Sequence, residues 1–205
     1  MEEIEKSILS AIYLVEVGGK SLEDSLKIKN GYTKNIINSK INELIKNKLV
    51  NEDRITLTEL GRSSLRVVLA GGVFDIIHPG HVYTLNAAKA LGDILIVVVA
   101  TDNTAVTMKK IQPLHSQKQR QELVNSLVMV DLCLVGQEDN IFKTVNLVKP
   151  QIIALGYDQV HQEKFIVEGC KKIGINAKVA RLQSPIPGSS TSKIKKEYGE
   201  SIHGI

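Results

Sequence analysis

Two apolar runs separated by a helical pattern dominate the middle of the chain. The runs span residues 67–70 and 94–100, and between them apolar residues recur near helical spacing: Val82, Leu85, Ala88 and Leu91. Runs that are apolar without alternation suit strands covered on both faces of a sheet. Two such strands joined by a helix form a βαβ unit with a parallel strand pair. The pattern therefore predicts an α/β fold built on a parallel, Rossmann-like sheet.

Strand and helix patterns continue to alternate toward the C-terminus. It predicts helices at residues 116–127, 140–148 and 163–173 and strands at 130–135, 152–155 and 177–180. Ligands of such sheets bind beyond the carboxyl ends of the strands. Gly71-Gly72, Asp75 and Asp102 follow strands of the βαβ unit, and Gly156 follows a later one. We expect these residues to meet at one edge of the sheet.

The first 65 residues follow a different pattern. Helical spacing begins at Ile4, Thr33 can cap a further helix, and two short apolar stretches flank residues 51–54 as a small hairpin. This order resembles a winged helix-turn-helix, whose recognition helix would present Lys34, Asn35, Asn38 and Lys40. We therefore predict two domains, residues 1–65 as a winged helix and residues 66–205 as the α/β domain.

Charge does not decide the role of residues 1–65. The segment holds ten Lys and Arg against ten Asp and Glu, so the net charge of +4 lies in residues 66–205. A DNA-binding module usually shows a basic face. Binding of DNA and a role in packing or homodimer formation both stay open.

Composition and apolar patterning bear on whether the protein contacts a membrane and on where it is located. Hydrophobic residues make up 43% of the 205, yet no apolar run approaches the roughly 20 residues of a membrane span. The acidic start Met1-Glu2-Glu3 does not resemble a signal peptide. Cys133 and Cys170 form no paired pattern, which is typical of reduced thiols. We expect a cytoplasmic protein without a membrane partner.

The spacing His-x-Gly-His at residues 78–81 favours phosphate chemistry. Pro79 fixes φ, and Gly80 allows close approach of the backbone to a ligand. His81 then lies at the start of a helix, where free N–H groups favour an anion. The alternatives are metal ligands or ordinary loop residues, but two ligands alone make a poor zinc site. His115, His161 and His203 fit no motif, and we predict them to be surface residues.

The stretch GVFDIIHPGH resembles the GTFD-x-x-H-x-GH signature of the cytidylyltransferase-like nucleotidyltransferases. That family includes glycerol-3-phosphate cytidylyltransferase, phosphopantetheine adenylyltransferase and the archaeal FAD synthases. Three later stretches agree with it: ATDNT at 100–104, LGYDQ at 155–159 and GSSTSKI at 188–194. Val73 stands where threonine is usual, so a hydroxyl is missing but the backbone N–H remains. The resemblance extends from Arg66 to about Glu197.

The resemblance implies a set of site residues. His78, His81 and Lys110 would be catalytic. The nucleotide-binding residues would be Gly72, Val73, Phe74, Asp75, His78, Gly80, His81, Asp102, Arg120, Gly156, Asp158, Arg181, Ser190 and Thr191. Mg²⁺ would arrive with the nucleotide, with no metal site formed by the protein alone and no permanently bound cofactor.

The implied reaction transfers a nucleoside monophosphate from an NTP to a phosphorylated acceptor and releases pyrophosphate. FMN adenylyl transfer with ATP, which makes FAD, is the leading interpretation. The alternative is cytidylyl transfer from CTP to glycerol-3-phosphate or a related polyol or sugar phosphate. A third interpretation, of another class, is a DNA-binding regulator that senses a nucleotide or cofactor.

Overall fold

The computed structural model describes residues 1–18, 21–22, 33–138, 140–156, 159, 162–183 and 194. The chain divides into two compact units, Met1–Arg66 and Val67–Ile205. Each unit is described by itself below. None of the described helices is long and apolar enough to cross a membrane.

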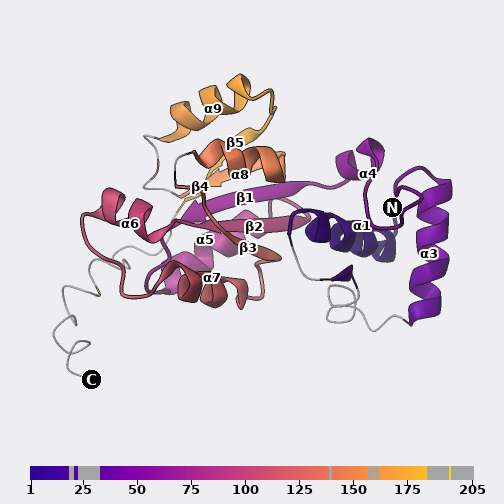
Figure 1. Ribbon diagram of the computed structural model, residues 1–205, viewed down its shortest axis with the longest axis horizontal. Coiled ribbons are helices and arrows are strands. Elements are labelled where there is room, and N and C mark those ends of the chain that lie inside the picture. The colour runs from indigo at the N-terminus through magenta and orange to yellow at the C-terminus, as the bar shows by residue number, and fades with distance from the viewer. Residues whose placement is uncertain are drawn as a thin grey trace. The chain divides into compact units, whose positions relative to one another are not determined.

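The second unit is built on a parallel sheet of five strands (Figure 1). These are β1 (Val67–Gly72), β2 (Ile94–Val99), β3 (Leu132–Val135), β4 (Ile152–Leu155) and β5 (Lys178–Arg181), in the order β3-β2-β1-β4-β5. Every neighbouring pair is parallel. The predicted α/β class and its Rossmann-like parallel sheet are therefore confirmed.

Helices cover both faces of this sheet. Figure 1 shows α5 (Pro79–Lys89) and α7 (Gln117–Asn125) on one face, with α8 (Ile141–Val148) and α9 (Glu163–Lys172) on the other. The first four residues of both β1 and β2 are buried without alternation. A strand buried on both sides has no polar face, which explains the continuous apolar runs in the sequence.

The strand order creates a switch point beside β1. The chain proceeds outward through β2 and β3, then returns to place β4 on the other side of β1. In open α/β sheets the crevice at such a point receives the ligand. The side chain of Gln159 spans it, accepting from Gly156 N at 2.9 Å and donating to Gly71 O at 3.5 Å.

Both cysteines of this unit are free and buried. Burial raises the pKa of the Cys133 thiol to about 12 and also raises the pKa of Cys170. The thiolate is the reactive form, so both side chains behave as small apolar groups of the core.

One helix was not predicted. Helix α6 (Asp102–Lys109) follows β2 directly, and Thr101 caps it by accepting from Thr104 N at 3.1 Å. Ala105 is the buried residue of this short helix, so its sequence carries almost no helical apolar pattern. Strand β5 lies one residue later than predicted.

The first unit contains the helices α1 (Glu3–Glu16), α3 (Lys34–Lys46) and α4 (Glu59–Ser63). Thr33 caps α3 and Thr58 caps α4, and a bridge from Val50 to Leu57 marks the expected hairpin. The buried side chains of this unit include Ile8, Ile12, Ile41 and Leu44. Residues 19–20 and 23–32, between α1 and α3, lie outside the described residues, so the winged helix stays a prediction.

Candidate active site

The loop between β1 and α5 begins with unusually close packing. Phe74 is buried and adopts a left-handed backbone, with φ of 53°. A Cβ atom added at Gly72 would lie 2.9 Å from the Phe74 ring, so a larger residue there would force this ring to shift. The Phe74 ring in turn lies 5.2 Å from the His81 ring, centroid to centroid. Aromatic packing thus positions one histidine from inside the loop.

The two histidines of the motif stack on each other. Their ring centroids are 3.8 Å apart and the ring planes are inclined by 32°. His78 is the N-cap residue of α5, Pro79 begins the helix, and His81 lies in its first turn. Both rings therefore stand at the helix N-terminus, on the carboxyl edge of β1, where backbone N–H groups and the helix dipole favour an anion.

His78 carries an unsatisfied polar atom. Its Nδ1 is buried and has no hydrogen-bond partner within the part of the chain that the structure describes. Burial lowers the pKa of His78 below its ordinary value of 6.5. The ring is therefore neutral at pH 7, and a neutral imidazole presents one N–H donor and one acceptor. Because the neutral ring holds no counter-ion, its N–H group can donate to a phosphate oxygen directly.

Asp75 fastens a second segment to this loop. Its side chain is buried, and Oδ1 accepts a hydrogen bond from His115 N at 3.1 Å. The His115 ring lies against the same residue, with Nδ1 3.0 Å from Asp75 O. His115 is predicted to be a surface residue; its side chain is 41% exposed, and it also joins this segment to the histidine loop. Forty positions separate it from Asp75, and no local pattern in the sequence could reveal the pairing.

Arg120 is the centre of a buried network. Its side chain is fully buried, at 0% exposure. Nη1 donates to Val73 O at 2.6 Å, Nε donates to His115 O at 3.0 Å, and Nη2 donates to Asp102 Oδ1 at 2.7 Å. The implied role of Arg120 as a nucleotide-binding residue needs correction, because its side chain is fully buried and Nε, Nη1 and Nη2 each donate to another group of the protein. Arg120 and Asp102 instead join the histidine loop to α6 and α7.

The other predicted residues lie on separate elements. Gly80 is buried in α5, Lys110 is the C-cap residue of α6 and has an exposed side chain, and Gly156 follows β4. Arg181 ends β5 and forms an ion pair with Glu163. The remaining predicted residues, Asp158, Ser190 and Thr191, lie outside the described residues.

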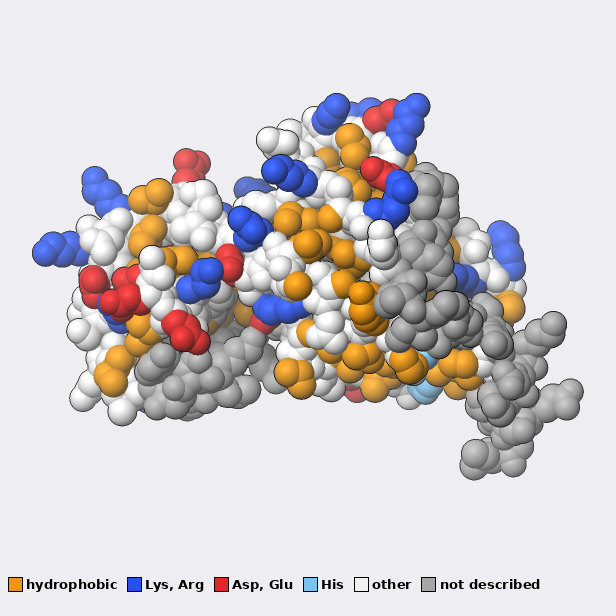
Figure 2. Space-filling view, turned by 180° about the vertical axis from the view of Figure 1, so that it is seen from behind, with side chains coloured by type: hydrophobic (Ala, Val, Ile, Leu, Met, Phe, Trp, Pro, Cys, Tyr) orange, Lys and Arg blue, Asp and Glu red, His pale blue; other side chains and the backbone are white. Residues whose placement is uncertain are grey.

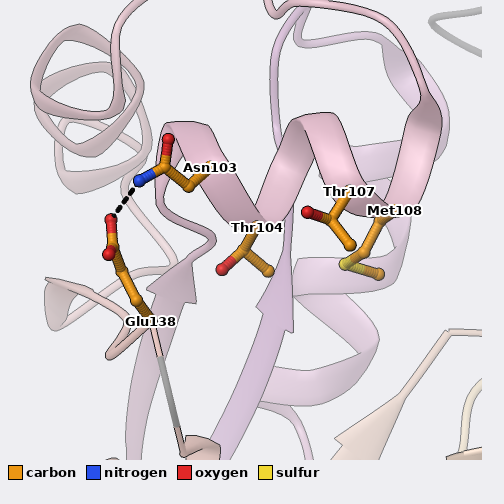
Figure 3. Close-up of a pocket in the computed structure, with 5 residues that line it drawn as sticks. All are labelled: Asn103, Thr104, Thr107, Met108 and Glu138. Carbon is orange, nitrogen blue, oxygen red and sulfur yellow. Dashed lines mark hydrogen bonds between the residues drawn. The ribbon is translucent and has the colours of Figure 1, made fainter.

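A small pocket lies beside α6 (Figure 3). It is lined by Asn103, Thr104, Thr107, Met108 and Glu138. Asn103 Nδ2 donates to Glu138 Oε1 at 2.8 Å across its mouth. None of the predicted site residues lines it, so we place the candidate site at the histidine pair.

Two carboxylates of the segments around the histidine loop have hydrogen-bond partners within the chain. No group of three or more His, Cys, Asp or Glu that could hold a metal ion occurs among the described residues. The Asp75 carboxylate accepts from His115, and the Asp102 carboxylate accepts from Arg120. These two carboxylates are used to join segments of the protein.

Known proteins resemble this chain over the same region. Residues 69–197 match the cytidylyltransferase-like family model. The FAD synthase of Picrophilus torridus is 47% identical over 115 residues, which are 56% of this chain and 82% of that protein. The FAD synthase of Aciduliprofundum boonei is 50% identical over 134 residues, 65% of this chain and 80% of that protein.

A solved structure agrees with the fold. The lipopolysaccharide core biosynthesis protein of Thermoplasma volcanium GSS1 is 41% identical and superposes with a TM-score of 0.57, covering 60% of this chain and 99% of its own. The family model spans the histidine loop, the buried arginine network and all the strands after β1. The chain belongs to the cytidylyltransferase-like family of nucleotidyltransferases.

Proposed function

We propose that the chain is an FMN adenylyltransferase, which makes FAD and pyrophosphate from ATP and FMN. The observation that carries this proposal is the stacked pair of His78 and His81 at the N-terminus of α5, beside the switch point of the sheet. The similarity to archaeal FAD synthases, at 47% and 50% identity, supports the choice of substrates.

In this mechanism a phosphate oxygen of FMN attacks the α-phosphorus of ATP in line, and pyrophosphate leaves. The nucleophile is already an anion, so no strong general base is required. Catalysis then depends on positioning and on stabilisation of charge. His78 and His81 donate N–H groups to phosphate oxygens as negative charge shifts toward the leaving group.

The remaining residues supply charge and position. Lys110 and Arg181 neutralise phosphate charge, and Ser190 and Thr191 bind the phosphate tail. Asp158 contacts the acceptor or the nucleotide. Arg120 is a positioning residue in this scheme, because it holds the carbonyl of Val73 in the loop that leads to the histidines.

Mg²⁺ accompanies the nucleotide in this proposal. When bound it would supply positive charge that offsets the charge of the phosphate groups. Few ligands come from the protein, because the carboxylates of Asp75 and Asp102 have partners within the chain.

The experiment is a substrate matrix. Pyrophosphate release is measured with ATP or CTP, each combined with FMN, glycerol-3-phosphate or no acceptor, and products are separated by chromatography. We expect FAD from ATP and FMN only. Turnover with CTP and glycerol-3-phosphate, and none with ATP and FMN, would move the protein to the cytidylyltransferase alternative.

We propose a second role, DNA binding, for the first unit. In α3 and the hairpin, Arg54 donates to Asn42 Oδ1 at 2.7 Å and to Asn38 Oδ1 at 3.4 Å. Amide groups and a guanidinium of this kind suit base edges in the major groove. This cluster of side chains supports binding of double-stranded DNA through α3.

A further inference from the structure

Exposed apolar side chains gather on α6 and on the segment that joins it to α7. Val106 is 36% exposed, Met108 50%, Ile111 63% and Leu114 40%. We call residues 103–114 the strap. Single exposed apolar residues are ordinary on a protein surface, but a cluster of them indicates a surface that contacts something.

The two ends of the strap are fastened to the histidine loop. At one end Asp102 accepts from Arg120 Nη2, and at the other His115 O accepts from Arg120 Nε. The same guanidinium holds Val73 O, and Asp75 holds His115 N. One buried side chain therefore fixes both ends of the strap relative to the loop that carries His78 and His81.

The strap lies at the edge of the sheet where the strands have their carboxyl ends. Figure 1 shows α6 and the segment after it beyond the carboxyl ends of the strands. The histidines among the described residues are His78, His81 and His115. The pale blue surface in Figure 2 therefore marks this edge, and hydrophobic side chains border it.

We propose that the strap is the acceptor subsite, and that its apolar side chains cover the planar aromatic ring system of the acceptor. This inference rests on the proposed function and names the residues that select the acceptor. A flavin ring is a large apolar plane, and covering it with Met108 and Ile111 removes apolar area from water. A polyol phosphate has no such surface and gains nothing from these side chains. Lys109 and Lys110 lie between them in the sequence and place positive charge near the acceptor phosphate.

The test replaces apolar surface without touching the core. Met108→Ser and Ile111→Ser are made singly and together, with Val128→Ser and Leu147→Ser as matched controls. Those two control side chains are 97% and 53% exposed in the same unit. KM is measured for FMN and for ATP separately. Inhibition by riboflavin, which carries the ring without the phosphate, is measured as well.

We expect each strap variant to raise the KM for FMN by about tenfold, as loss of part of one apolar contact predicts. The KM for ATP should change less than twofold, and riboflavin should inhibit the strap variants more weakly than the controls. Sedimentation equilibrium reports the oligomeric state of every variant.

Three outcomes overturn the inference. They are an unchanged KM for FMN, an equal rise in both KM values, and a change of oligomeric state that accounts for the lost activity. If the unmodified enzyme makes no FAD, the proposed function fails together with the inference. If it makes FAD and the strap variants match the controls, the inference alone fails.

Discussion

Arg120 Nη2 lies 2.7 Å from Asp102 Oδ1, and this ion pair joins two helices that flank the candidate site. The arginine side chain has no exposed surface, whereas the aspartate side chain is 34% exposed. Solvent therefore screens one end of the pair only. The other donors of the guanidinium serve backbone carbonyls, so its role extends beyond the ion pair.

Replacing Arg120 with methionine should destabilise the second unit by about 3 kcal/mol. The value lies at the lower end of the range for breaking a buried pair, because Asp102 keeps access to water. Arg120→Lys should also destabilise it, because one ammonium cannot reach all three acceptors with the geometry of a guanidinium. Urea unfolding measures both variants, with the exposed Lys118→Met of the same helix as control. A raised KM for ATP with unchanged stability would restore Arg120 as a nucleotide ligand.

His78→Ala and His81→Ala should each lower kcat by about a hundredfold or more. Loss of one donor to a developing oxyanion typically costs about 2.7–4 kcal/mol. Steady-state kinetics with ATP and FMN test this, with circular dichroism to verify folding. Asn86→Ala provides a control on the exposed side of the same helix. A variant with unchanged turnover removes that histidine from the mechanism.

The free energy of unfolding of the enzyme should decrease as the pH is lowered below about 6.5, because of His78. Its pKa is lowered in the folded state, whereas an unfolded histidine titrates near 6.5. Below about pH 6.5 the unfolded chain therefore binds more protons at this residue than the folded chain, and folding loses free energy as the pH falls. The free energy of unfolding of the enzyme should decrease relative to that of His78→Gln when the pH is lowered from 7.5 to 5.5. Titration of the ring by NMR gives the pKa directly, and a value at or above 6.5 would contradict this prediction.

Residues 66–205 alone should keep the activity. The contacts described around the histidine pair all lie inside the second compact unit. The expected kcat and KM for the fragment agree with those of the full chain within about threefold, an interval corresponding to less than 1 kcal/mol. Kinetics of the purified fragment provide the measurement, and its thermal unfolding verifies the fold. A folded but inactive fragment would show that the first unit completes the site.

The first unit should bind double-stranded DNA through the cluster around Arg54. Arg54→Gln and the double variant Asn38→Ala/Asn42→Ala should each weaken binding by about tenfold, within the range for loss of a base or phosphate contact. Fluorescence anisotropy against a pool of random duplexes at low salt measures the affinity. The control Lys118→Gln removes one positive charge from the second unit and should change the affinity for DNA little. Equal affinity for all variants would assign residues 1–65 to packing or dimer formation.

The sequence by itself determined the α/β class, the βαβ unit and the motif at its centre. Runs such as 94–100 are apolar at every position because both faces of the strand are covered, and that is visible without coordinates. The positions of His78 and His81 at the start of a helix follow from Pro79 and Gly80, which act on the local backbone. These features depend on residues that are close together in the chain.

Only the tertiary structure decided which distant residues meet. Arg120 contacts Val73 across 47 positions and Asp102 across 18, and nothing in their local sequence separates a buried guanidinium from a solvated one. His115 likewise gains its partner, Asp75, only when the sheet brings their segments together. The physical reason is that desolvation and hydrogen bonding depend on three-dimensional neighbours, whereas apolar periodicity depends on the local geometry of a strand or helix.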